Sequence, residues 1–198
     1  ITLATAAITI TTADDAINLQ GTVDGNQALT LASGSGAVTV DGAIGSGTNK
    51  ALTSFTVNSS GAGSIEIANI GTTSAAGVSG ATAIGNNNTG TLTLDGTVYT
   101  TNAATYTAAT GENIDLKGGA TTTFTSSNDA ITFGTATVEM ADGSNLTIDT
   151  DTLGGAIDLA SGVMGTSSEN ITLTAGTGTV AIGACLLYTS DAADETCR

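Results

Sequence analysis

Apolar residues recur along the chain in pairs at positions i and i+2, usually with a polar residue between them. Successive side chains of an extended strand point to opposite faces, so this period of two predicts short β-strands, each with two inward residues. Gly, Asn, Asp and Ser, which favour turns, fill the stretches between pairs. The pairs are Ile8/Ile10, Ile17/Leu19, Leu29/Leu31, Val38/Val40, Phe55/Val57, Ile65/Ile67, Leu92/Leu94, Ile114/Leu116, Ile131/Phe133, Val138/Met140, Leu146/Ile148, Ile157/Leu159, Ile171/Leu173 and Val180/Ile182. A helix is not expected, because the best candidate, Thr100–Asn113, is rich in Thr.

Strands at this spacing fit either a β-sandwich or a coil of strands, and three features favour the coil. Each strand offers only two inward residues, and the aromatic residues that usually fill a sandwich core are few: three Phe, three Tyr and no Trp. The chain also repeats itself. LTLASGSGAVTV, from Leu29, matches ITLTAGTGTVAI, from Ile171, and DAINLQGTV, from Asp15, matches DAITFGTATV, from Asp129. We therefore predict an all-β fold, a right-handed parallel β-helix (β-solenoid) with rungs of roughly 20–30 residues, and keep β-sandwich repeats as the alternative.

The last 14 residues, 185–198, differ in character from the rest. They contain both cysteines of the chain, Cys185 and Cys197, and one of its three basic residues. Cys185–Glu195 can be encoded in frame by the sequence of a transposase-type sequencing-library adapter, which this stretch resembles. We therefore expect residues 185–198 to be a non-native, adapter-derived tail, and residues 1–184 to be a β-solenoid fragment of a larger repeat protein.

Composition restricts the chemistry that the chain can perform. The chain holds 18 acidic and three basic residues, of which three acidic residues and one basic residue lie in the tail. Residues 1–184 therefore keep 15 acidic residues and two basic ones, Lys50 and Lys117. Nucleic acid is therefore not an expected partner, since its phosphates would be repelled. The chain contains no run of 18 apolar residues, so insertion into a membrane is not expected. Without His, and without Cys once the tail is set aside, a Ser/His/Asp or Cys/His arrangement and a histidine-ligated metal site cannot be built.

One segment has the glycines of a phosphate-binding loop. Gly42–Lys50 has the sequence GAIGSGTNK, but it lacks the Gly-Lys pair that such a loop needs. Because Gly, Ser and Asn also favour turns, we predict that this segment is a corner of the coil. We assign it no cofactor.

Two pairs of carboxylates are candidates for glycosidase chemistry, which needs two acids at a defined separation across a cleft. They are Asp14 with Asp15, and Asp149 with Asp151. Neighbours in sequence at a corner are more often solvated charges, so we predict no catalytic residues.

The second of these pairs also suggests part of a calcium loop, because two glycines follow it. Leu153, however, stands where the usual Asp-x-Asp-x-Asp-Gly order has its third ligand. We favour acidic corners without a metal ion.

Several stretches carry a resemblance to a known family. They include VDGNQALTLASGSGAVTVDGAIG (Val23–Gly45), TYTAATGENIDLKGGATTTFTSSNDAITF (from Thr105) and ADGSNLTIDT (from Ala141). They resemble the repeats of giant bacterial surface adhesins of the filamentous haemagglutinin-like, β-strand-repeat class, and the resemblance covers residues 1–184. It implies secretion across the outer membrane, a β-helical shaft at the cell surface, and a role in adhesion or biofilm formation. It also implies that other parts of the parent protein contact glycans or proteins on host or neighbouring cells.

These observations favour a structural stalk or adhesion segment of a secreted, extracellular bacterial surface protein without catalytic activity. Two alternatives stay open. A carbohydrate-active β-helix enzyme would have a cleft lined by carboxylates from neighbouring rungs. A Thr-array binder of ice or crystal surfaces, suggested by ITIT (Ile8–Thr11) and TTTFT (Thr121–Thr125), would have regular outward Thr columns on one flat face.

Overall fold

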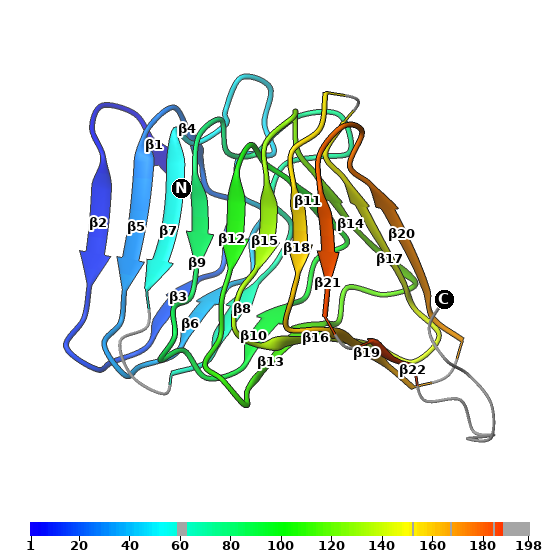
Figure 1. Cartoon of the computed structure of the whole chain (residues 1–198). Coiled ribbons are helices and arrows are strands. Elements are labelled where there is room, and N and C mark those ends of the chain that lie inside the picture. The colour runs from blue at the N-terminus through cyan, green and yellow to red at the C-terminus, as the bar shows by residue number, and fades with distance from the viewer. Residues whose placement is uncertain (59–62, 152, 167, 184, 188–198) are drawn as a thin grey trace.

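A computed structural model describes residues 1–58, 63–151, 153–166, 168–183 and 185–187. Every regular element in these residues is a β-strand, and the strands form a parallel β-solenoid of about seven turns (Figure 1). The coil is right-handed, which is the usual hand for parallel strands joined by crossovers. The predicted fold class is thus confirmed, and the sandwich alternative is wrong.

Three parallel sheets form the faces of the coil. The first sheet contains β2 (Ile8–Thr11), β5 (Ala28–Ala32), β7 (Ser54–Asn58), β9 (Thr82–Ile84), β12 (Ala104–Tyr106), β15 (Ile131–Phe133), β18 (Ile157–Leu159) and β21 (Val180–Ile182). The second sheet contains β3 (Ile17–Leu19), β6 (Val38–Val40), β8 (Ile65–Ile67), β10 (Leu92–Leu94), β13 (Asn113–Leu116), β16 (Thr137–Met140), β19 (Val163–Gly165) and β22 (Cys185–Leu187). The third sheet contains β11 (Val98–Thr100), β14 (Thr121–Thr125), β17 (Asn145–Asp149) and β20 (Asn170–Thr174), and a separate pair is formed by β1 (Thr2–Leu3) and β4 (Asp24–Gly25).

Each turn of the coil, here called a rung, stacks in register on the previous one. Ile8 pairs with Leu29 and Phe55 with Thr82, and these separations of 21 and 27 residues are the shortest and longest in the first sheet. Backbone hydrogen bonds join the rungs at the corners as well as in the strands. With about 4.8 Å between strands, the eight strands of the first sheet extend about 34 Å along the axis.

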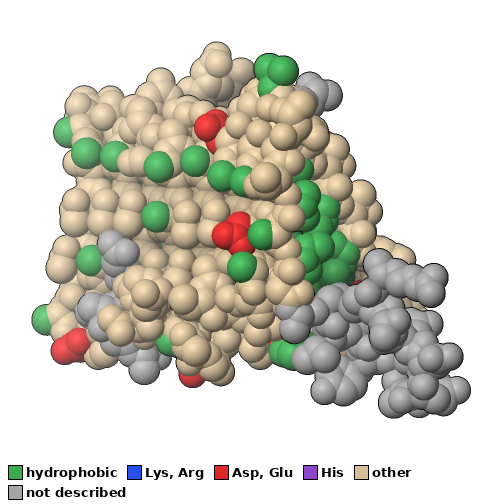
Figure 2. Space-filling model, viewed as in Figure 1, with side chains coloured by type: hydrophobic (Ala, Val, Ile, Leu, Met, Phe, Trp, Pro, Cys, Tyr) green, Lys and Arg blue, Asp and Glu red, His purple; other side chains and the backbone are tan. Residues whose placement is uncertain are grey.

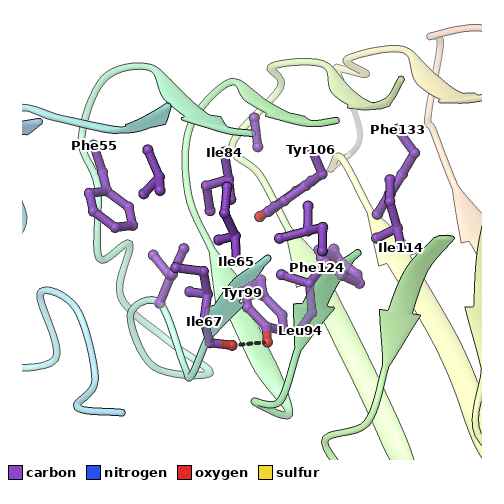
Figure 3. Close-up of a cluster of buried hydrophobic side chains, with 14 of the residues drawn as sticks. Phe55, Ile65, Ile67, Ile84, Leu94, Tyr99, Tyr106, Ile114, Phe124 and Phe133 are labelled. Carbon is purple, nitrogen blue, oxygen red and sulfur yellow. Dashed lines mark hydrogen bonds between the residues drawn. The ribbon is translucent and has the colours of Figure 1, made fainter. Parts of the chain in front are cut away.

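The third face changes width along the axis. In the first rungs it consists of single bridging residues, Val23, Ile44 and Ile70, and it becomes a strand only at β11, where Tyr99 continues the series. The wider part of the core is filled by aromatic rings. Tyr99, Tyr106, Phe124 and Phe133 are buried there and contact one another. Figure 3 shows these rings in the core among aliphatic side chains such as Ile84, Ile65 and Leu94.

All 14 apolar pairs identified in the sequence lie in strands. Most of their members point into the core, whereas those of β2, β20 and β21 are partly or largely exposed. The pattern missed eight strands: β1, β4, β19, β22, and β9, β11, β12 and β14 of the middle rungs. The strands of this last group are irregular on their inner face. They place Thr82, Tyr99, Ala104 or Thr122 inward instead of a pair of large aliphatic side chains. The segment Thr100–Asn113 contains β12 and the first residue of β13, so the expectation of no helix is confirmed.

The internal repeat in the sequence does not coincide with a rung. Its first copy spans β5 and β6, in the first and second sheets, whereas its second copy spans β20 and β21, in the third and first sheets. In both copies a corner follows the first strand, and the same glycine of that corner has a positive φ: 61° at Gly34 and 52° at Gly176. What repeats is therefore a strand–corner–strand unit, which the fold uses at different corners of the coil.

Strand β22 extends the second sheet into the segment that the sequence assigns to the tail. Its backbone pairs with β19, with Val163 opposite Cys185. An open edge of parallel strands can pair with the backbone of many sequences, so this pairing does not bear on where the segment comes from. Residues 188–198 lie outside the described part, and the assignment of a non-native tail stays a prediction.

Candidate functional site

The two pairs of acidic residues considered for glycosidase chemistry lie far apart. Asp14 and Asp15 lie in the corner between β2 and β3, in the first rung, whereas Asp149 ends β17 in the sixth. Five rungs at about 4.8 Å separate the two pairs by about 24 Å, so a carboxylate of one pair cannot act together with a carboxylate of the other. Asp14 Oδ1 accepts hydrogen bonds from the Ser35 backbone N–H (2.9 Å) and from its hydroxyl (2.8 Å), and these bonds lower the pKa of Asp14. Asp14 therefore joins two stacked corners.

The corner that suggested a calcium loop is held by hydrogen bonds within the protein. Asp149 Oδ1 accepts a hydrogen bond from the Asp151 N–H (2.9 Å), and the Leu153 N–H donates to Asn128 Oδ1 of the rung before (3.1 Å). The Leu153 side chain is 75% exposed. Among the described residues, no three Asp, Glu, His or Cys side chains come together as possible metal ligands.

Gly42–Lys50 forms the third side of the second rung and the corner after it. Ile44 is fully buried and bridges Val23 and Ile70 of the adjacent rungs. The N–H groups of Ile44 and Gly45 donate to the carbonyl groups of Asn69 (2.9 Å) and Val23 (2.8 Å). A phosphate-binding loop needs such N–H groups to be free, so the resemblance is superficial. The prediction of a corner is confirmed, with the addition of one core residue.

The second sheet carries a line of carboxylates that the sequence analysis did not single out. Its members are register partners on the consecutive strands β8, β10, β13 and β16, and all point to the outer face: Glu66, Thr93, Asp115 and Glu139. We call Glu66, Asp115 and Glu139 the acidic column. Each stands between the two apolar members of its pair, so the signal was present in IEI, IDL and VEM. Finding it required knowing which pairs share a face.

Among the described residues, one cation is paired with the acidic column. Lys117 Nζ forms an ion pair of 2.9 Å with Asp115 Oδ2, and this contact raises the pKa of Lys117. Glu139 accepts a hydrogen bond from Asn113 Nδ2. The hollow beside these residues measures about 50 Å³, which holds a few water molecules, whereas ligand pockets usually measure about 300–1,000 Å³. This hollow is therefore smaller than the cleft that a carbohydrate-active enzyme needs.

The first sheet carries a line of hydroxyl groups on its outer face. The central outward position of its strands is occupied in turn by Thr9, Thr30, Thr56, Ala83, Thr105, Thr132, Asp158 and Ala181. We call the five threonines of this series the threonine column. ITIT (Ile8–Thr11) begins it, whereas TTTFT (Thr121–Thr125) lies in the third sheet.

Hydroxyl groups at several corners, in contrast, hold the fold together. Ser33 is fully buried and donates to the Gly36 carbonyl (2.6 Å), and the buried Thr150 donates to the Gly155 carbonyl (2.7 Å). Ser126 likewise donates to the Asp129 carbonyl. Each of these bonds closes a corner by satisfying a backbone carbonyl, so these hydroxyls have a structural role.

Comparisons with protein-family models, with curated proteins and with solved structures found no match. In the described part of the chain, no helix is long and apolar enough to cross a membrane.

Proposed function

We propose that residues 1–184 are a structural stalk segment of a secreted bacterial surface protein, which holds other parts of that protein away from the cell. The observation that carries this proposal is the unbroken register of the first sheet from β2 to β21. A coil of this kind grows by about 4.8 Å per rung without changing its cross-section, so its length depends only on the number of repeats.

The chemistry of the described residues agrees with a structural role. The two corner pairs of carboxylates lie five rungs apart, and Asp115 and Glu139 of the acidic column face a hollow of only about 50 Å³. The chain has a net charge of −15, which keeps neighbouring molecules apart in solution. The extracellular location, the role in adhesion or biofilm formation, and partners on other cell surfaces rest on the resemblance to haemagglutinin-like repeats and are part of the proposal.

The proposal requires a rigid coil, and rigidity can be measured on the chain itself. Spin labels on Thr9→Cys and Asp158→Cys would lie in one line of the first sheet, six rungs or about 29 Å apart. The two cysteines that the chain already contains, Cys185 and Cys197, are first replaced by Ser. Pulsed electron resonance should give one narrow distance near this value. A broad distribution of distances would overturn the stalk, because a flexible segment cannot hold a fixed spacing.

Catalysis is tested separately, by incubating the chain with neutral and acidic polysaccharides. We expect no release of reducing ends. Cleavage that is lost on Glu139→Gln or Asp149→Asn would replace the stalk by the enzyme alternative.

A further inference from the structure

The two ends of the coil expose apolar side chains. Among the described residues, the large apolar side chains that are exposed are those of Ile1, Ile8, Leu153, Val180 and Ile182. All of them except Leu153 belong to the first or the last rung. Figure 2 shows hydrophobic side chains gathered at the C-terminal end of the coil, in the region between β21 and β20 of Figure 1. The exposed apolar surface is therefore concentrated where the coil is open.

Each of these end positions has a stacked rung on one side only. Ile8 is 39% exposed, whereas its register partner Leu29, at the same inward position of the next rung, is 2% exposed. Val180 is 45% exposed, and its partner Ile157 is fully buried. Leu29 and Ile157 have a described strand on both sides in the first sheet. One further rung at each end would bury Ile8 and Val180 in the same way.

Three columns of inward side chains run the length of the coil and end in these exposed positions. Two of them belong to the first sheet. The third follows the third face, where the register of β1 places Ile1 beside Val23, and continues to β20. The first and last members of the three columns are Ile1 and Leu173, Ile8 and Val180, and Ile10 and Ile182. All of them are branched aliphatic side chains, so the last rung can pack on the first rung of a second copy as it packs on its own neighbour.

The strand edges at both ends are open and lack charged side chains. Strands β2 and β21 are outermost in the first sheet, so each has one edge without a strand partner among the described residues. Proteins usually protect such an edge with charged side chains, but residues 1–13 and 170–183 contain no Asp, Glu, Lys or Arg. The amino group of Ile1 donates to the Thr22 carbonyl of its own chain (2.6 Å). The charged side chains behind the net charge of −15 therefore lie outside these end strands.

We propose that the C-terminal end of one copy of the chain stacks on the N-terminal end of a second copy. Strand β21 pairs in parallel with β2 of the second copy, and each of the three columns continues across the joint. A strand of an unrelated protein could pair with one open edge, whereas a second copy matches all three columns at once. Because the two ends are different surfaces, the joint leaves a free end on each side, and association continues into a filament. Each added copy contributes about eight rungs, or about 38 Å.

This inference does not rest on the proposed stalk function, since the joint depends only on the two end rungs. Repulsion between acidic copies opposes the joint and is screened by salt, so filaments should lengthen as the salt concentration rises. The spin-label measurement of the stalk is made on labelled chain diluted in unlabelled chain, so that a joint adds no distance between labels. Failure of the joint therefore leaves the result of the stalk experiment unchanged.

The test measures the association of the full chain by sedimentation over a range of concentrations, with a reducing agent to keep cysteines from linking copies. The native chain should form species larger than dimers, and electron micrographs should show rods of constant width that lengthen in steps of about 38 Å. Ile8→Lys and Val180→Lys each place a charge in the joint and should raise its dissociation constant more than about tenfold. Leu153→Lys is the matched control, because Leu153 is 75% exposed at a corner, and it should assemble like the native chain. Circular dichroism and melting curves establish that each variant is folded, and Ile1→Lys or Ile182→Lys replaces one that is not.

Mixing the two end variants determines the direction of the joint. Ile8→Lys keeps an intact C-terminal end and Val180→Lys keeps an intact N-terminal end, so an equal mixture should form dimers and nothing longer, while each variant alone stays monomeric. Three results would overturn the proposal. The first is a native chain that is monomeric at the highest concentration measured. The second is dimers of Ile8→Lys alone, which would assign the joint to two like ends. The third is an equal loss of assembly in Leu153→Lys and Val180→Lys, which would assign it to surfaces other than the ends.

Discussion

The ring of Tyr99 lies over the ring of Phe124, with centroids 4.8 Å apart and an angle of 14° between the planes. The two residues are register partners on β11 and β14, so one aromatic side chain stacks on another across a rung. Tyr106 and Phe133, on β12 and β15, repeat this arrangement at 5.2 Å and 23°. Edge contacts between the two stacks close the group, and such pairs contribute about 0.5–1.5 kcal/mol each beyond their burial. They stabilise one register of the coil where the third sheet begins.

The two buried tyrosines differ in what their hydroxyl groups do, and this difference predicts different effects of the same substitution. The Tyr99 hydroxyl donates to the Ile67 carbonyl (3.0 Å) and accepts from the Gly96 N–H (2.8 Å). The Tyr106 hydroxyl has no partner among the described residues. Tyr99→Phe should therefore lower the free energy of unfolding by about 1–3 kcal/mol, whereas Tyr106→Phe should leave it unchanged or raise it. Urea unfolding measures both. Equal losses would mean that the Tyr106 hydroxyl has a partner, such as a buried water molecule.

Burial of the same two side chains predicts a loss of stability in alkali. Burial raises the pKa of both Tyr99 and Tyr106 well above the ordinary 10.0. Above pH 10 the unfolded chain loses these protons while the folded chain keeps them, so the unfolded state binds fewer protons and stability falls as pH rises. The slope should approach about 1.4 kcal/mol per pH unit for each tyrosine. The double variant Tyr99→Phe/Tyr106→Phe should have a much flatter profile between pH 10 and 12; an unchanged slope would assign the alkaline loss to other groups.

The fold could be predicted from the sequence because its main rule is local. A pair such as Leu92 and Leu94 encodes a strand and its inward face without reference to any other segment. The first part of the third face could not be predicted in this way, because it consists of single residues such as Ile44, which have no period. The acidic column and the threonine column could not be predicted from local patterns either. Both depend on which strands lie in the same sheet, and this is determined by corners whose length varies along the chain.

The repeated corner unit predicts where a hydroxyl group is useful. Ser33 and Ala175 occupy the same position in the two copies. The backbone carbonyl of each accepts a hydrogen bond from the N–H of the second glycine of its corner, which is Gly36 (3.0 Å) for Ser33 and Gly178 (2.7 Å) for Ala175. Only Ser33 also donates, to the Gly36 carbonyl. Ser33→Ala should lower the unfolding free energy by about 0.5–1.5 kcal/mol, and Ala175→Ser should raise it by a similar amount. Denaturant midpoints measure both. A loss of stability in Ala175→Ser would show that the two corners differ in shape.

The register of the first sheet predicts that neighbouring positions of β5 respond very differently to a charge. Leu31 is fully buried and Thr30 points outward. Leu31→Asp would bury a carboxylate without a partner and should cost several kcal/mol or prevent folding. Thr30→Asp should cost less than about 1 kcal/mol, through its lower strand propensity. Thermal melting compares the two variants. Similar melting temperatures would mean that the register is wrong.

The acidic column predicts a position at which a positive charge stabilises the fold. Thr93 is the register partner of both Glu66 and Asp115, and Lys117 is already paired with Asp115. Opposite charges on adjacent strands contribute about 0.2–1 kcal/mol, so Thr93→Lys should raise the unfolding free energy by this amount for each of its two acidic neighbours, Glu66 and Asp115. The gain should shrink at 1 M salt, where the Debye length is about 3 Å.

Thr30→Lys, on the uncharged face of the first sheet, is the matched control and should change the unfolding free energy little at any salt concentration. Denaturant unfolding of both variants at low and high salt separates the charge effect from the effect of a longer side chain. If Thr93→Lys stabilised the fold no more than Thr30→Lys at low salt, the three carboxylates would not act together on the second sheet. Their alignment would then be a result of strand register without electrostatic consequence.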